Sequence, residues 1–434
     1  MTIDILCKVV DNFGDIGVAY RLAKALTDLD PSLALRLHVD DLVAFHALCP
    51  EVEPGREVQV VRGWTVLRWN ADWAGLRERP PRAVLECFAC GRPERFEEIL
   101  YDSADPEPRY VVNIEHLTAE SWAADFHLLP SATRSGLVRK WMFMPGFSEG
   151  TGGLIIDRRF REARESALAL DGRAGGRAEG RARLADELAA LGATLGAAAT
   201  TGAGGGATAL GAAAAPGAEG SATALGAAAA PGAEPARAML RDLAGRRWVS
   251  VFSYERDYGR VVEDLAAADR ERPLAALAAA GRSQACFLAA WEAAGRPFPV
   301  LVLPFLPQEV WDEVILASDF SIVRGEESLA RAALSGRPFL WHAYLQDGKH
   351  QLVKVRALLD RLRPQFGAAD FGPVEEAFLA FNDRERDEPA TAGRERISPF
   401  LAARSDEPFR AFAEGLAARG DLAAHLMTFL GKIR

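Results

Sequence analysis

The segment Phe320-Ser-Ile-Val-Arg-Gly-Glu-Glu-Ser328 carries the clearest indication of how this chain folds. Residues 320–323 are apolar or small and predict a buried strand, which a loop over 324–328 connects to a helix over 328–334. A turn at Ser335-Gly-Arg-Pro338 then leads into another strand over 339–341. Two short apolar strands joined by a helix indicate a parallel pair, because parallel strands need a long crossover connection.

The same alternation extends along the chain on both sides of this segment. Apolar runs predict strands over 3–10, 33–39, 58–61, 83–87, 110–113, 248–252 and 298–303, and helical spacing is found over 18–29 and 308–317. From about Val374 the pattern is helical, and 416–430 should be amphipathic or well buried. The alternation indicates an α/β protein with parallel sheets covered by helices on both faces.

One low-complexity tract complicates the domain count. Its 47 residues, from Ala189 to Pro235, include 21 Ala and 11 Gly, and a segment repeats with a period of 15 residues. Pro and Gly interrupt each Ala run, which disfavours a continuous helix. We therefore predict an insertion in a surface loop, and the alternative is a functional linker.

At roughly 150 residues per domain, 434 residues suggest three domains, but without the tract about 390 remain, enough for two. The predicted division is an N-terminal domain over 1–155, a connecting segment over 156–188, the insertion over 189–235, a C-terminal domain over 236–385 and C-terminal helices over 386–434.

Composition excludes several classes of protein. The formal net charge is −9 and no basic run is long enough for a nucleic-acid site, so we expect no nucleic-acid partner. No apolar stretch is long enough for a transmembrane helix, and the N-terminus lacks the pattern of a signal peptide. Five scattered cysteines argue against a disulfide framework. These observations predict a cytoplasmic protein with no membrane partner.

The loop over 324–328 has the composition of a phosphate site. A loop that leaves a parallel strand and enters a helix points backbone N–H groups at an anion, and the helix dipole adds to the attraction. Gly325 permits close approach, Ser328 can cap the helix or bind an oxygen, and Arg324 can pair with a diphosphate. The alternative is a helix whose first turn simply contains favourable acidic residues.

Two carboxylates lie in a predicted loop directly after the first predicted strand, in Asp11-Asn-Phe-Gly-Asp-Ile-Gly17. The dinucleotide-binding pattern Gly-x-Gly-x-x-Gly is absent here, so dinucleotide binding is disfavoured. Asp11 and Asp15 suit general-base catalysis or the binding of a cation. The alternative is an Asp-capped entry into the following helix.

Weaker signals have simpler interpretations. Cys87 and Cys90 form an isolated Cys-x-x-Cys pair, which we assign to core packing, since no second pair exists for zinc. The histidines show no metal-ligand spacing; His342 could touch a ligand or be structural. Glu115 and Trp122 could face a protein partner or serve capping and packing.

Residues 304–352 resemble the nucleotide-sugar half of a GT-B glycosyltransferase, although sugar epimerases share this pattern. Over nearly the whole chain except the tract, the sequence is similar to the EarP-type protein-arginine rhamnosyltransferases. The similarity lies in Val9-Val-Asp-Asn-Phe-Gly-Asp-Ile-Gly17, Asn113-Ile-Glu-His-Leu-Thr-Ala-Glu-Ser-Trp122, Pro145-Gly-Phe147, Thr151-Gly-Gly-Leu154, Phe252-Ser-Tyr-Glu255 and Ile322-Val-Arg-Gly-Glu-Glu-Ser328.

The resemblance implies a fold and a set of site residues. The fold would be GT-B, with two Rossmann-like domains facing a central cleft and the C-terminal helices packing back towards the N-terminal domain. The essential carboxylates would be Asp11, Asp15 as the general base, and Glu326. The nucleoside would be held by Phe252, Tyr254, Phe305 and Gln308, and the diphosphate and ribose by Arg324, Glu327, Ser328 and Tyr344.

The resemblance also implies a reaction. An inverting enzyme would move L-rhamnose from dTDP-β-L-rhamnose to an arginine of translation elongation factor P, with no cofactor and no metal. Two departures stand out: Gly-Glu-Asp-Ser of the family is Gly-Glu-Glu-Ser here, and the insertion is much longer. Two alternatives remain open, a GT-B enzyme with another acceptor or an epimerase, and a catalytically silent nucleotide-sugar-binding protein.

Overall fold

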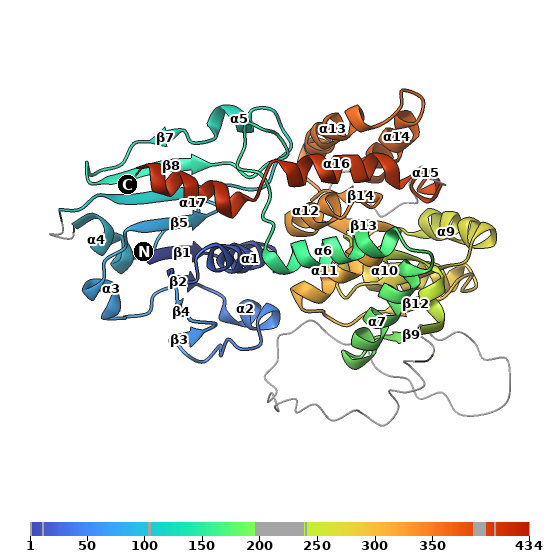
Figure 1. Ribbon diagram of the computed structural model, residues 1–434, viewed down its shortest axis with the longest axis horizontal. Helices are drawn as coiled ribbons and strands as arrows, with labels where there is room; N and C mark the ends of the chain where they lie inside the picture. Colours follow the sequence, from blue (N-terminus) through green and yellow to red (C-terminus); the bar gives the residue numbers. More distant parts are fainter. Residues whose placement is uncertain are drawn as a thin grey trace.

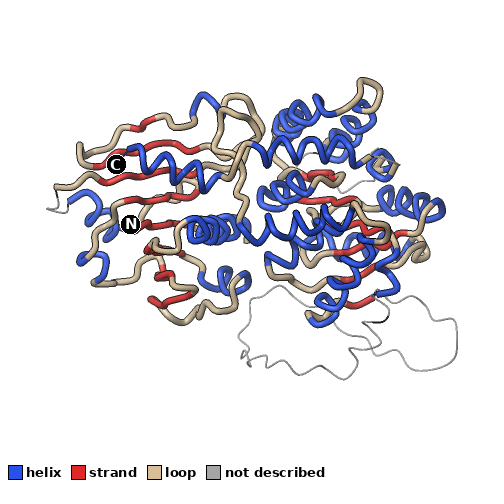
Figure 2. Tube along the Cα trace, viewed as in Figure 1, coloured by secondary structure: helices blue, strands red, loops and turns tan. Residues whose placement is uncertain are grey.

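The computed structural model describes residues 2–10, 13–102, 106–195, 238, 241–384, 396–402 and 405–433. Asp11 and most of the Ala/Gly-rich tract therefore lie outside the described residues. Two α/β units lie side by side, the N-terminal one in blue to cyan and the second in green to orange (Figure 1). Figure 2 shows the strands of each unit gathered into a sheet with helices packed around it.

The N-terminal sheet has eight strands. In spatial order they are β3 (Val58–Val61), β4 (Trp64–Arg68), β2 (Ala34–Val39), β1 (Thr2–Cys7), β5 (Ala83–Cys87), β6 (Arg109–Ile114), β8 (Val138–Phe143) and β7 (Pro130–Ser131). Only β3 and β7, at the two edges, pair in the antiparallel sense. The helices between the strands are α1 (Gly14–Leu29), α2 (Leu42–Leu48), α3 (Gly75–Glu78), α4 (Glu94–Asp102) and α5 (Ala123–Phe126). Strands β1, β5 and β6 are buried almost throughout, as expected of central parallel strands.

The second sheet has six strands, in the order β14 (Phe339–His342), β13 (Phe320–Arg324), β10 (Arg247–Val251), β11 (Leu274–Ala278), β12 (Val300–Val302) and β9 (Thr194–Leu195). All pairs are parallel except β9 with β12. Its helices are α6 (Arg158–Asp171), α7 (Gly176–Ala190), α9 (Gly259–Glu271), α10 (Arg282–Ala293), α11 (Gln308–Ala317), α12 (Gly325–Ser335), α13 (Gln351–Leu362), α14 (Phe371–Asn382) and α15 (Ser398–Leu401). Short 3-10 turns span Leu243–Gly245, Asp347–Lys349 and Arg363–Gln365.

The last two helices link the units. Helix α16 (Asp406–Ala418) packs on α12, whereas α17 (Leu422–Ile433) returns to the N-terminal unit and buries Leu422, Leu426 and Leu430 in its core (Figure 1). The chain passes from one unit to the other twice. A hydrogen bond joins the two crossing segments, in which Leu422 N donates to Leu154 O at 2.9 Å. This confirms the expected two-domain GT-B fold, in which the last helix, α17, packs back on the N-terminal domain.

Several local predictions were wrong. In place of the predicted loop over 324–328, Arg324 ends β13 and residues 325–328 form the first turn of α12, which Ser328 does not cap. Asp15 likewise lies inside α1. In both places acidic residues favoured by the helix dipole extend the helix towards the strand. Strand β1 also ends three residues earlier than predicted, at Cys7.

Five strands, β4, β7, β8, β9 and β11, were not predicted, and the first residues of the predicted tract belong to the fold. Strand β11 reads Leu-Ala-Ala-Leu-Ala, which favours a helix by local propensity, and tertiary packing overrides it. Strand β8 was missed because charged residues interrupt its apolar pattern. Residues 189–195, assigned to the insertion, complete α7 and form β9, with Ala193 buried.

Candidate active site

A cavity of about 260 Å³ lies between the two domains, where the carboxyl ends of both sheets meet. Open α/β sheets bind ligands at this edge, because helix N-termini and flexible loops converge there. The cavity brings together Phe252, Tyr254, Phe305, Gln308, Arg324, Glu326, Glu327 and Ser328 from the predicted site, with Phe13, Leu48 and Trp311 among the residues that complete its wall. Tyr344 does not line the cavity but contacts Tyr254, with ring centroids 5.8 Å apart.

Aromatic rings form one wall of the cavity. The guanidinium of Arg324 lies 4.8 Å from the ring of Phe252 and 4.7 Å from that of Tyr254, so both rings hold it by cation–π contact. Trp311 packs edge-on against Phe252 and donates its Nε1–H to Ser328 Oγ at 3.2 Å. Trp311 was not predicted as a site residue, although its place one turn after Gln308 on a predicted helix was a usable signal. This wall can accommodate a flat nucleoside base beside a fixed cation.

An aromatic contact and the hydrogen bonds of one glutamine join the two domains at the cleft. Phe13, before α1, and Phe305, after β12, have ring centroids 4.8 Å apart. The amide of Gln308 donates to Gly17 O at 3.1 Å and accepts from Lys24 Nζ at 3.0 Å. Gln308, predicted to bind the nucleoside, therefore also attaches the donor-side wall to α1.

The first turn of α12 forms the floor of the cavity. Gly325 has φ of 68°, a left-handed conformation that turns the chain sharply from β13 into the helix. The backbone N–H groups of a first helical turn have no partner within the helix, so together with Arg324 they make a local site for negative charge. The interpretation of this segment as a phosphate site is consistent with its geometry, even though it is helical.

Glu326 projects from that turn and contacts the N-terminal domain. Its Oε1 is 2.9 Å from His116 Nδ1, and its Oε2 accepts from Leu117 N at 2.8 Å. The hydrogen bond to Glu326 raises the pKa of His116 above 6.5; burial opposes this shift, while the charges of Glu326, Asp15 and Glu115 add to it. Sequence reasoning did not identify His116, because no local pattern relates it to a residue 210 positions away.

Asp15 lies in the first turn of α1 with only 7% of its surface exposed. Its Oδ2 accepts from Val10 N at 2.8 Å, which ties the helix back to the end of β1. The negative charge of Asp15 also raises the pKa of His116, so Asp15 and Glu326 shift the pKa of the same imidazole in the same direction. Asp11, the other predicted carboxylate of this loop, lies outside the described residues.

Glu327 belongs to a buried ion network behind the cavity. Arg21 of α1, with no exposed side-chain surface, contacts Glu327, Asp157 and Asp312, with Nη2 2.9 Å from Asp312 Oδ1. Arg331 Nε lies 3.2 Å from Glu327 Oε1. Glu327 was predicted to bind the diphosphate and ribose, but its carboxylate forms ion pairs with two arginines. None of these partners could be identified from sequence.

Burial and these charges set opposite pKa shifts in the two aspartates. Burial would raise the pKa of Asp157, but Arg21, Arg331 and Lys24 outweigh it and lower that pKa to about 2. Burial dominates at Asp312 and raises its pKa to about 6 despite Arg21. The network is therefore electrostatically tight and depends on Arg21.

Three further candidates of the sequence analysis lie away from the cavity. His342 is buried, hydrogen-bonds Ser253 Oγ at 2.7 Å and supports Tyr254 from behind; burial lowers its pKa well below 6.5. Glu115 pairs with Asn113 Nδ2, and Trp122 is 44% exposed against Phe126. His342 is thus structural rather than a ligand contact.

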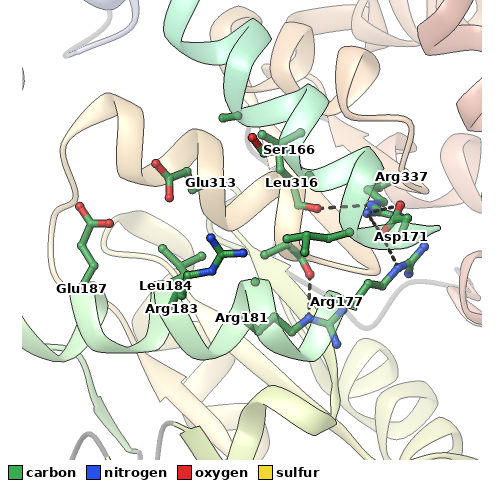
Figure 3. A pocket seen from close by; sticks show the side chains of 15 residues that line it. Ser166, Asp171, Arg177, Arg181, Arg183, Leu184, Glu187, Glu313, Leu316 and Arg337 are labelled. Carbon is green, nitrogen blue, oxygen red and sulfur yellow. Dashed lines mark hydrogen bonds and ion pairs between the residues drawn. The ribbon is translucent and has the colours of Figure 1, made fainter. Parts of the chain in front are cut away.

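A second cavity, of about 310 Å³, lies among α6, α7 and α11 and is rich in arginine (Figure 3). Arg177 and Arg337 both contact Asp171, at 2.9 and 2.8 Å, and Arg181 donates to Ala317 O at 2.9 Å and to Asp319 at 2.6 Å. Because these guanidinium groups are already paired within the protein, this cavity is a structural ion cluster that fastens α7, and we place the reaction in the first cavity.

Two parallel sheets with a cavity between their carboxyl edges define the fold of the GT-B class. A model of the family described as "Elongation-Factor P (EF-P) rhamnosyltransferase EarP" matches residues 3–186 and 227–431. The chain belongs to this EarP family and is a protein-arginine glycosyltransferase, which transfers rhamnose to an arginine of a protein.

Individual relatives agree with this assignment. The protein-arginine rhamnosyltransferase of Pseudomonas putida is 34% identical over 378 residues, covering 83% of this chain and 81% of that protein. That of Pseudomonas aeruginosa is 31% identical over 436 residues, with 98% of both chains covered. A solved structure concerned with EarP-mediated arginine glycosylation of translation elongation factor EF-P has a TM-score of 0.54 at 22% identity, covers 99% of both chains and shares the fold.

Two features are absent from the residues that the structure describes. None of the helices in this part of the chain is long and apolar enough to cross a membrane. Within the same residues, no group of three or more His, Cys, Asp or Glu side chains is placed to hold a metal ion.

Proposed function

We propose that this chain transfers L-rhamnose from dTDP-β-L-rhamnose to one arginine of translation elongation factor P, with inversion at the anomeric carbon. The observation that carries the proposal is the cavity itself, in which an aromatic wall, Arg324 and the first turn of α12 lie beside Glu326. One side suits a nucleoside diphosphate and the other a cationic acceptor. Translation takes place in the cytoplasm, where we expect the enzyme to act.

The donor would bind on the side of the C-terminal domain. Phe252, Tyr254 and Phe305 would hold the base, with Gln308 at their edge, while Ser328 and Tyr344 would reach the ribose and phosphates. Arg324 and the N–H groups of α12 would balance the charge that develops on the leaving diphosphate. This arrangement would need no metal ion, a prediction that unchanged turnover in the presence of a chelator would support.

The acceptor would meet the carboxylates. A guanidinium is a poor nucleophile because its charge is delocalised and it stays protonated at all ordinary pH values. Glu326, with Asp11, would orient it, and one nitrogen would attack the anomeric carbon as the bond to the diphosphate oxygen breaks and its electron pair leaves with the diphosphate. Asp15 would take the proton lost by that nitrogen, so the product keeps its guanidinium charge.

The test is to incubate the protein with dTDP-β-L-rhamnose and elongation factor P and to weigh the acceptor by mass spectrometry. We expect a gain of one deoxyhexose on one arginine, and an anomeric configuration opposite to that of the donor by NMR. Asp15→Asn should abolish turnover while dTDP still binds in calorimetry. No mass gain with wild-type protein would refute the acceptor or donor assignment; consumption of the donor without any acceptor would indicate an epimerase instead.

A further inference from the structure

Both oxygens of the Glu326 carboxylate are held by one short segment of the opposite domain. His116 Nδ1 and Leu117 N lie 2.9 and 2.8 Å from Oε1 and Oε2. A carboxylate offers about four lone-pair sites, so these two bonds leave one site on each oxygen. Each oxygen can therefore still accept a hydrogen bond from a guanidinium N–H.

The imidazole of His116 rests on a rigid platform. It stacks on Phe88 with ring centroids 4.4 Å apart and an interplanar angle of 16°. Phe88 follows β5, has a left-handed φ of 58°, and donates its N–H to Ile114 O at the end of β6 at 2.7 Å. A large side chain in this conformation is strained and persists where the surrounding structure imposes it. The stacking therefore fixes the plane of the imidazole, although its side chain is 57% exposed.

Neighbouring negative charges raise the pKa of His116. Its neighbours are the carboxylates of Glu326 from α12, Asp15 from α1 and Glu115 from its own segment, and its hydrogen bond with Glu326 raises its pKa. The imidazole therefore keeps a proton to higher pH than an isolated histidine does. When it is protonated, this imidazole places a positive charge next to these carboxylates.

We infer, building on the function proposed above, that His116 is a positioning residue which holds the Glu326 carboxylate for the acceptor guanidinium and that the acceptor binds its neutral form. Neutral imidazole with its proton on Nδ1 can still donate to Glu326 Oε1. Imidazolium beside a guanidinium on the same carboxylate would place two like charges together, which is unfavourable. Acceptor binding should therefore release one proton.

The sign of the pH dependence follows from this linkage. Below the raised pKa of His116 the imidazole is charged and must lose its proton before the acceptor binds. The KM for the acceptor should then rise as pH falls, by up to about tenfold per pH unit. Above that pKa the KM should be constant. The KM for the donor, which binds on the other wall, should not follow this trend.

The experiment uses the full chain with elongation factor P and dTDP-β-L-rhamnose, and compares wild type with His116→Asn and His116→Ala. Asparagine places an amide N–H where Nδ1–H lies and cannot titrate. We expect His116→Asn to retain most of kcat with an acceptor KM that no longer rises at low pH, and His116→Ala to lose about tenfold or more in kcat. The matched control is His350→Asn, the same change at an exposed histidine on the donor domain.

An activity-independent measurement separates this inference from the proposed function. NMR titration of the His116 imidazole in the free protein should show a pKa that falls on Glu326→Gln. An unchanged titration would overturn the inference even if turnover is confirmed. So would an acceptor KM in His116→Asn with the same pH dependence as wild type, or wild-type kcat in His116→Ala. Absence of wild-type turnover would instead count against the proposed function.

Discussion

Replacing Arg21 by methionine should destabilise the protein far more than removal of an ordinary salt bridge. Arg21 is wholly buried and contacts Asp157, Asp312 and Glu327, which lie on three different segments of the chain. Removal of one partner from a buried ion pair costs about 3–5 kcal/mol, because the charge left behind stays desolvated. Methionine keeps much of the aliphatic part of the side chain, so the main loss is that of the guanidinium group.

The cost should depend on pH with a definite sign. The pKa of Asp312 is raised to about 6 by burial even with Arg21 in place, and Arg21 opposes that shift. Without Arg21 this carboxyl should hold its proton to higher pH in the folded protein, so the folded state binds more protons than the unfolded state does. Stability then falls as pH rises, and the loss should be larger at pH 8 than at pH 5.5.

Urea denaturation followed by circular dichroism at both pH values measures this difference. The control is Arg56→Met, which removes an exposed pair between Arg56 and Glu53 in the same domain and should cost less than about 1 kcal/mol. A loss in Arg21→Met no larger than in this control at pH 8 would refute the argument that the network is buried and interdependent.

Three further predictions follow from the same structure. Arg324→Lys keeps the charge but loses the planar fork held by two rings, so calorimetry should show dTDP affinity about tenfold to a hundredfold lower; equal affinity would contradict the role of the fork. Gly325→Ala should lower the unfolding free energy by about 1–2 kcal/mol, because φ is 68° while no atom lies within 4 Å of an added Cβ; no change would show that the turn relaxes freely. Deleting 199–233 should preserve activity and melting temperature, whereas deleting 189–235 also removes buried Ala193 and strand β9 and should cost about 2 kcal/mol; identical melting temperatures would contradict this.

The fold was largely predictable because buried strands and helices have characteristic patterns of apolar residues over short stretches of sequence. Strand β13 and helix α11 lie where their periodicity placed them. Strand β11 could not be predicted, because alanine and leucine are equally compatible with a helix. This segment is a strand because it pairs with β10 and β12. The predicted loops before α1 and α12 are helical because the position of a helix start depends on packing as well as composition.

The sequence alone determined which residues follow the strands, and therefore which aromatic and charged side chains gather at the carboxyl edges of two parallel sheets. That much is local: a strand ends where its apolar run ends. Tertiary structure alone decided the partners, pairing Glu326 with His116 and Glu327 with Arg21 across the domain boundary. These pairs join positions far apart in the chain. The sequence does not specify which charges will pair, because the pairing depends on folding, which excludes water and brings the two groups together.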